Sequence, residues 1–153
     1  MEIDTLAVQE FAAPIETVFD RAVDHRQFSR FMKKTGPIPG IADAEIEDGK
    51  PPAVGAHRRV KMTDGSVMME EILALDRPSR HQYRWLNRPA FPFSLLVRGA
   101  EATWTFVPAG NGARIEWRYR FELTSPLVYP LAAPVVAIFR RWMANALLAM
   151  AKA

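Results

Sequence analysis

The chain has 153 residues, a length typical of one domain, and it contains no cysteine. The lack of cysteine excludes disulfides, Cys-ligated zinc, iron–sulfur clusters and thiol nucleophiles. The formal net charge is only +3, and so mild an excess gives no support for a nucleic-acid partner. The N-terminus, Met1–Thr5, lacks the basic and then apolar pattern of a signal peptide, so we expect a cytoplasmic protein.

The first part of the chain predicts a strand followed by two short helices. Residues 3–11 are rich in β-forming side chains with rough alternation. Pro14 suits the first turn of a helix, and a second short helix is expected over residues 26–32. The glycines and prolines of residues 36–40 end that helix. The first helix has its apolar side chains on one side: Ile15, Val18, Phe19 and Ala22.

The middle of the chain predicts consecutive strands joined by turns. Asp64-Gly65 is a strong signal for a two-residue hairpin, and residues 110–112, Gly-Asn-Gly, mark another tight connection. Strands joined in series by hairpins form an antiparallel meander. The expected strands cover residues 41–48, 54–63, 66–75, 80–87, 96–107 and 113–123.

The last strand and the C-terminal segment have the clearest periods. Apolar and charged side chains alternate from Arg114 to Leu123, which predicts one buried face and one wet face. The apolar stretch from Pro126 to Phe139 also contains Pro130 and Pro134 and is shorter than the roughly 20 residues of a membrane-spanning helix. After Pro126 apolar residues recur every three or four positions, as in a helix with one apolar side: Val136, Phe139, Met143, Ala146, Leu147 and Met150.

These elements predict an α+β helix-grip fold within a single domain over residues 1–153. A strongly curved antiparallel sheet of about seven strands must wrap around the long C-terminal helix, because nothing else covers its apolar face. Two short helices follow the first strand. We expect an internal cavity for a small apolar or amphipathic molecule.

The order of elements resembles the START-like or SRPBCC superfamily, which includes the polyketide cyclase/dehydrase-like proteins and the major birch pollen allergen. Five local segments look similar to its motifs: residues 14–19, 54–59, 75–80, 103–105 and 112–117. These motifs are structural, so the resemblance implies the fold and a cavity and leaves the reaction open. Family members include lipid carriers, hormone receptors, cyclases and dehydratases.

A charged pair is predicted inside the cavity. Counting from a two-residue turn places Arg58 opposite Glu71, on the more apolar face that also carries Met69. A buried pair costs desolvation, which suggests a polar anchor for a ligand. A strand bulge would bring Arg59 and Glu70 inward instead, and the family's hormone receptors look similar at Arg58 with a glutamate near position 70 or 71. A solvated surface ion pair is the remaining alternative.

Aromatic and small side chains on the neighbouring strands predict the hollow itself. Tyr83 and Trp85 share a face with His81, and the small Ala100 and Ala102 leave space opposite large aromatics. Ordinary core packing is the alternative for each aromatic residue.

Arg98 shares the face of Trp104 and is expected near the mouth, where it would hold a carboxylate or phosphate or form a rim charge. The proline-rich segment 87–93 is a candidate lid, or a packed connection. The complete set of predicted ligand-binding residues is Arg58, Met69, Glu71, Tyr83, Trp85, Arg98, Trp104, Trp117, Tyr119, Phe139 and Met143.

The sequence predicts no metal site, no cofactor and no catalytic triad. Its three histidines share no spacing, its serines lie outside any nucleophile-elbow context, and glycine-rich phosphate loops are absent. No catalytic residue is assigned from the sequence.

Three functions remain open. The first is a non-catalytic module that binds or transports a lipid, quinone or aromatic product. The second is a polyketide cyclase or dehydratase in which Arg58 orients an enolate oxygen and Glu71 or Tyr83 moves protons. The third is transient contact with a membrane surface through the apolar residues 127–131 and the following Arg140 and Arg141, a stretch that otherwise leads into the final helix. The expected partner is a small hydrophobic ligand, and the chain is expected to be a monomer or a homodimer.

Overall fold

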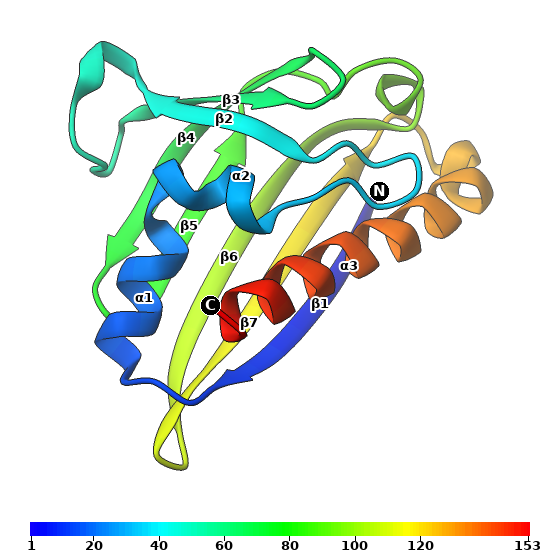
Figure 1. Cartoon of the computed structure of the whole chain (residues 1–153). Coiled ribbons are helices and arrows are strands. Elements are labelled where there is room, and N and C mark those ends of the chain that lie inside the picture. Colours follow the sequence, from blue (N-terminus) through cyan, green and yellow to red (C-terminus); the bar gives the residue numbers. More distant parts are fainter.

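The structure is a computed structural model that describes residues 1–153. Seven strands, three α-helices and four short 3₁₀ helices follow one another along the chain (Figure 1). They are β1 (Glu2–Phe11), α1 (Ile15–Val23), η1 (His25–Gln27), α2 (Phe28–Phe31), β2 (Ile41–Ile46), η2 (Glu47–Gly49), β3 (His57–Met62), β4 (Val67–Asp76), β5 (Arg80–Trp85), η3 (Phe93–Leu95), β6 (Val97–Ala109), β7 (Gly112–Leu123), η4 (Pro126–Val128) and α3 (Tyr129–Ala151).

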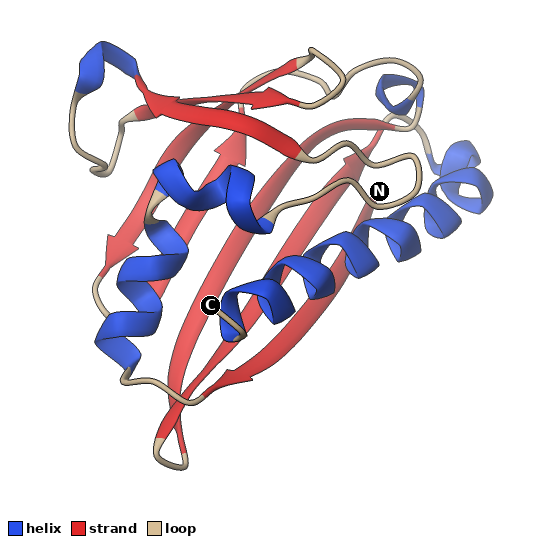
Figure 2. Cartoon of the chain, viewed as in Figure 1, coloured by secondary structure: helices blue, strands red, loops and turns tan.

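All seven strands form one antiparallel sheet in the order β1-β7-β6-β5-β4-β3-β2. Figure 2 shows α3 lying along one face of the curved sheet, with α1 and α2 on the same side and β2 and β3 bending over its end. The predicted α+β helix-grip fold is confirmed. The reason is that the sheet has one apolar face, and the apolar side of α3 covers it.

The periods predicted for β7 and α3 are confirmed by burial. The five inward residues of β7, from Ile115 to Leu123, are at most 3% exposed. On α3, Met143, Ala146 and Leu147 are fully buried, at 0% exposed. These two buried surfaces form the centre of the hydrophobic core.

The two-residue turn predicted between β3 and β4 is wrong. The N–H of Met62 donates to the carbonyl of Ser66 at 2.8 Å, so Thr63, Asp64 and Gly65 form a three-residue loop. Gly65 has φ of 89°, the left-handed conformation that such loops require at their last position. The carboxylate of Asp64 accepts the N–H of Ser66 at 2.9 Å, which holds the turn. The longer loop shifts the register of β4 by one residue.

The segment Pro126–Ala151 is the one helical stretch long and apolar enough to span a membrane by length and composition. A core helix meets the same criteria. The deeply buried Met143 and Leu147 show that α3 uses its apolar side to cover the sheet.

Candidate functional site

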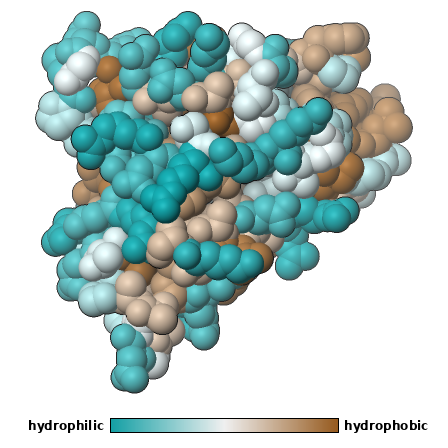
Figure 3. Space-filling view, viewed as in Figure 1, coloured by the Kyte–Doolittle hydropathy of each residue, from teal (hydrophilic) through white to brown (hydrophobic).

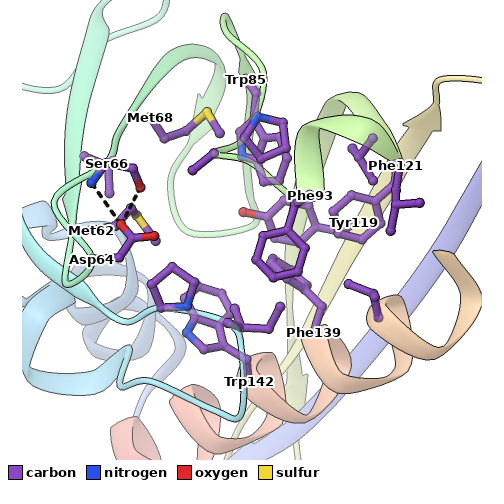
Figure 4. A pocket seen from close by; sticks show the side chains of 18 of the residues that line it. Met62, Asp64, Ser66, Met68, Trp85, Phe93, Tyr119, Phe121, Phe139 and Trp142 are labelled. Atoms are coloured by element: carbon purple, nitrogen blue, oxygen red, sulfur yellow. Dashed lines mark hydrogen bonds between the residues drawn. The ribbon is translucent and has the colours of Figure 1, made fainter. Parts of the chain in front are cut away.

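An apolar pocket lies between the inner face of the sheet, α3 and the loop that joins β5 to β6. It contains about 960 Å³ of empty space, part of which opens to solvent, and 18 of its 23 lining residues are hydrophobic. Figure 4 shows Met68 and Trp85 on one side of this pocket, with Phe139 and Trp142 of α3 on another. Phe139 and Trp142 share a side of the helix because they are three residues apart.

A buried ion pair lies at the inner end of the pocket. Arg58 of β3 is opposite Glu70 of β4, and the two residues are 1% and 6% exposed. Nε and Nη2 of Arg58 each lie 2.9 Å from Oε1 of Glu70. The guanidinium carbon is also 4.9 Å from the ring centroid of Phe28 and 4.8 Å from that of Tyr83. The cation is therefore held by one carboxylate and two aromatic faces.

Glu71 and Met69, both predicted to face the cavity, lie on the opposite face of the sheet. Glu71 is paired with His57 in the ladder and forms an ion pair with Arg84 at 2.6 Å on the outer face. The cause is the three-residue turn, because a shift of one residue exchanges the faces of a strand. Glu70 takes the inward position, which is the alternative left open by the sequence, although the turn and not a bulge produces it.

Arg98 is likewise not on the pocket face. The ladder pairs Val97 with Leu123 but Gly99 with Glu122, so Arg98 is an extra residue in a β-bulge. Its side chain is half exposed, lies 3.5 Å from Glu122 and donates to the carbonyl of Leu123 at 3.3 Å. Val97 faces inward in its place, at 7% exposed.

Neutral polar groups surround the ion pair. The hydroxyls of Tyr83 and Tyr119 lie 3.0 Å apart, and Nε1–H of Trp104 donates to the Tyr83 hydroxyl at 3.4 Å. His81 Nδ1 lies 3.1 Å from the carbonyl of Ala74, which can only accept, so Nδ1 carries the proton. Its Nε2 lies 3.4 Å from Nη1 of the Arg58 side chain. A neutral imidazole accepts a hydrogen bond there.

Burial controls the ionisation of these groups. Burial, with Arg58 as the second cause, lowers the pKa of His81 to about 3, which keeps the ring neutral. Burial raises the pKa of Glu70, while Arg58 opposes that shift. Burial raises the pKa of Tyr83 to about 12 and that of Tyr119 also upward, so both phenols keep their protons.

A second, smaller pocket lies on the inner side of the ion pair, and we name it the inner chamber. It contains about 300 Å³ of empty space. Glu70, Tyr119 and Trp142 line both this chamber and the outer pocket. The chamber's other polar lining residues are Arg58, His81, Tyr83, Trp104 and Trp117.

Residues 4–153 match the family model described as polyketide cyclase / dehydrase and lipid transport. The chain belongs to this family. No curated protein matches the sequence.

Several solved structures share the fold of this chain. The crystal structure of Ara h 8.0201 matches with a TM-score of 0.72 at 15% identity, covering 99% of this chain and 97% of that one. TTHA0849 from Thermus thermophilus matches with a TM-score of 0.70 at 21% identity, covering 98% and 95%. The di-domain ARO/CYC StfQ from the steffimycin biosynthetic pathway matches with a TM-score of 0.74 at 13% identity, covering 99% of this chain and 50% of StfQ. At these identities the likeness shows the fold alone.

In this polyketide cyclase/dehydrase family member, most of the site residues predicted from the sequence line the outer pocket or the inner chamber. Trp85, Tyr119 and Phe139 line the outer pocket. The inner chamber is lined by Arg58, Tyr83, Trp104 and Trp117. Met143, at 0% exposed, packs in the core and lines neither.

Several lining residues were not predicted. Trp142 could have been found, because it lies three residues after Phe139 on the same side of the helix. Met62 and Met68 flank the β3–β4 hairpin, whose register was predicted incorrectly. Phe93 and Leu96 belong to a connection without a periodic pattern, so nothing local indicated that they face the pocket. No group of three or more acidic or histidine side chains is placed to hold a metal ion.

Proposed function

We propose that this protein binds a small hydrophobic or amphipathic molecule, such as a lipid, quinone or polyketide-like aromatic compound, in the outer pocket. The observation that carries the proposal is the pocket's lining, in which 18 of 23 residues are hydrophobic and only Asp64, Ser66 and Glu70 are polar or charged among the others. Ligand sites commonly have this composition. The family description, which includes lipid transport, supports the same conclusion.

The proposal is tested with N-phenyl-1-naphthylamine, a neutral dye that becomes fluorescent in apolar surroundings. The wild-type protein should bind it with saturable fluorescence. Val136→Trp should weaken binding at least about tenfold, because Val136 lines the pocket and a larger ring fills it. Ala137→Trp, on the exposed side of the same helix, is the matched control.

A second filling variant, Ala90→Trp in the loop over the pocket, keeps the test informative if Val136→Trp does not fold. The absence of saturable binding to the wild-type protein would refute the proposal. If the wild-type protein does bind the dye, native mass spectrometry of protein purified from its own host, followed by denaturing extraction, would name the class of the natural ligand.

A second candidate function is cyclisation or dehydration of a polyketide-like substrate in the same pocket. The observation that favours it is the Arg58–Glu70 pair beside two phenols. In this scheme Arg58 orients an enolate oxygen and Glu70, replacing Glu71, moves the proton. A new carbon–carbon bond formed by attack of the enolate on a carbonyl would be followed by loss of water. Turnover of a poly-β-ketone that disappears in Glu70→Gln would support it, and unchanged turnover in that variant would refute it.

We also propose transient contact of the pocket mouth with a membrane surface. Phe91, Leu95, Leu127 and Leu131 are 77%, 60%, 88% and 67% exposed. Thr124 donates its N–H to Leu96 and its hydroxyl to Leu95, at 3.0 and 2.7 Å, which holds η3 beside the start of η4. Figure 3 shows hydrophobic surface gathered at this corner. Side chains so exposed favour an apolar partner.

Arg140, expected to support this contact, donates to the carbonyl of Leu6 at 2.8 Å and is tied to β1. Arg141 stays exposed, so the attraction comes from the apolar residues and this one arginine. Wild-type protein should sediment with phosphatidylglycerol vesicles, and Leu127→Ser/Leu131→Ser should not. No sedimentation of the wild-type protein at low salt would refute the contact. Cytoplasmic location and the choice between monomer and homodimer stay predictions.

A further inference from the structure

We propose that the inner chamber receives the uncharged polar end of the ligand, a hydroxyl such as that of a phenol or hydroxyketone, which both donates and accepts hydrogen bonds. This inference rests on the proposed ligand-binding function. It adds the chemical class of the ligand's buried end and excludes a carboxylate there.

Two residues that line the chamber carry hydrogen-bond donors without a partner. The indole N–H groups of Trp117 and Trp142 are buried, and neither donates to any protein atom. The two residues are 0% and 4% exposed, come from β7 and α3, and their ring centroids lie 5.7 Å apart. Buried donors are seldom left unpaired, because each has lost its hydrogen bond to water. The chamber is therefore suited to an acceptor atom that enters it.

One acceptor also lacks a partner. Both nitrogens of Arg58 that contact Glu70 lie against Oε1, and no protein group donates to Oε2. Glu70 lines both the outer pocket and the inner chamber, so its side chain lies where the two hollows meet. A ligand hydroxyl that donates to Oε2 would satisfy it while its own oxygen, or an adjacent carbonyl, accepts from an indole.

The charges in the chamber exclude an anionic group. Arg58 is the chamber's one cation, and its positive charge is already opposed by Glu70 at 2.9 Å. His81 is neutral, because its pKa is lowered to about 3 by burial and by Arg58. A carboxylate entering the chamber would meet the Glu70 carboxylate with no free cation, which costs both desolvation and repulsion.

The small size of the chamber also favours a single polar group. Its cavity volume is about 20 Å³, room for about one water molecule, against about 120 Å³ for the outer pocket. The bulk of the ligand therefore belongs in the apolar outer pocket, with its polar end directed inward. In the free protein, water can occupy the chamber, and the ligand's polar group would replace it.

Three probes of similar shape test the inference: naphthalene, 2-naphthol and 2-naphthoate. Each is measured at neutral pH by displacement of N-phenyl-1-naphthylamine. We expect 2-naphthol to bind about tenfold more tightly than naphthalene, as two modest hydrogen bonds allow. We expect 2-naphthoate to bind more weakly than either.

Variants connect the preference to named atoms. Glu70→Gln removes the opposing charge from Arg58, so the preference should invert in favour of 2-naphthoate. Trp117→Phe removes one indole N–H and should reduce the advantage of 2-naphthol over naphthalene without abolishing naphthalene binding. Glu71→Gln, a neighbouring glutamate on the outer face, is the matched control and should leave all three affinities unchanged.

The outcomes separate this inference from the proposed function. If neither the dye nor any naphthalene derivative binds, the ligand-binding function itself fails. If naphthalene binds as tightly as 2-naphthol, or 2-naphthoate binds most tightly to the wild-type protein, the pocket binds ligands but the inference is wrong. If Glu70→Gln does not fold, the Trp117→Phe comparison decides alone.

Discussion

Breaking the Arg58–Glu70 pair should cost far more stability than replacing both partners. Arg58→Leu leaves Glu70, which is 6% exposed, without the cation that lies 2.9 Å from its oxygen. Removal of one partner of a buried pair typically costs about 3–5 kcal/mol, whereas apolar replacement of both is often neutral. We therefore expect Arg58→Leu to lose about 3 kcal/mol or more, and Arg58→Leu/Glu70→Leu to recover most of that loss.

The loss should also depend on pH. Burial already raises the pKa of Glu70, and Arg58 opposes the rise, so Arg58→Leu raises it further. A carboxyl whose pKa is higher in the folded than in the unfolded state binds its proton more readily when folded. Stability of Arg58→Leu should therefore fall as the pH rises above the unfolded value of about 4.5.

Urea unfolding followed by tryptophan fluorescence gives the free energies for a double-mutant cycle at pH 5 and pH 7.5. The outer pair Glu71–Arg84, with one side chain half exposed, is the matched control, and its cycle should give at most about 1 kcal/mol. If Arg58→Leu costs less than about 1 kcal/mol and shows no coupling to Glu70→Leu, the argument for a buried pair is refuted.

Three further predictions concern stability. The pKa of His81 is lowered from 6.5 to about 3, so the folded state should lose stability as the pH falls from 6.5. Urea midpoints measured between pH 7 and 4 should depend less on pH in His81→Leu than in the wild-type protein. The same pH dependence in both proteins would contradict this prediction. Gly65→Ala should lower the free energy of unfolding by roughly 1 kcal/mol through its φ of 89° alone. Gly112→Ala should lower it much more, because an added Cβ would lie 1.9 Å from the backbone oxygen of Phe11. Equal decreases in the melting temperatures of the two variants would show this reasoning to be wrong. Met143→Ala should lower the free energy of unfolding in urea by about 2–5 kcal/mol. It should leave 2-naphthol binding more tightly than naphthalene, because Met143 lines neither hollow. A changed order of affinities would contradict the placement of Met143 in the core alone.

The fold was predictable because its signals are local. The alternation along residues 114–123 corresponds to β7, and the helical period after Pro126 corresponds to α3. The tight connection expected at residues 110–112 joins β6 to β7 through two residues, Gly110 and Asn111, with Gly110 at φ of 57°. Given seven strands and one amphipathic helix, very few arrangements cover the apolar face.

The inward face of two strands was not predictable with the same rules. Asp64-Gly65 suits both a two-residue turn and the last two positions of a three-residue loop, and that choice decides between Glu70 and Glu71. The bulge at Arg98 has no local signal of comparable strength. In a strand, one added residue moves every side chain beyond it to the other face.

The sequence by itself determined the order of elements and the helix-grip architecture, and it left open whether Arg58 or Arg59 faces the apolar interior. Only the tertiary structure decided that Glu70 neutralises Arg58, that Trp142 lines the pocket while Met143 fills the core, and that the indoles of Trp117 and Trp142 lack partners. The physical reason is that periodicity reports which side of an element is buried, whereas lining a pocket depends on how helix, sheet and loop meet. That meeting is set by turn lengths, bulges and packing between residues far apart in the chain.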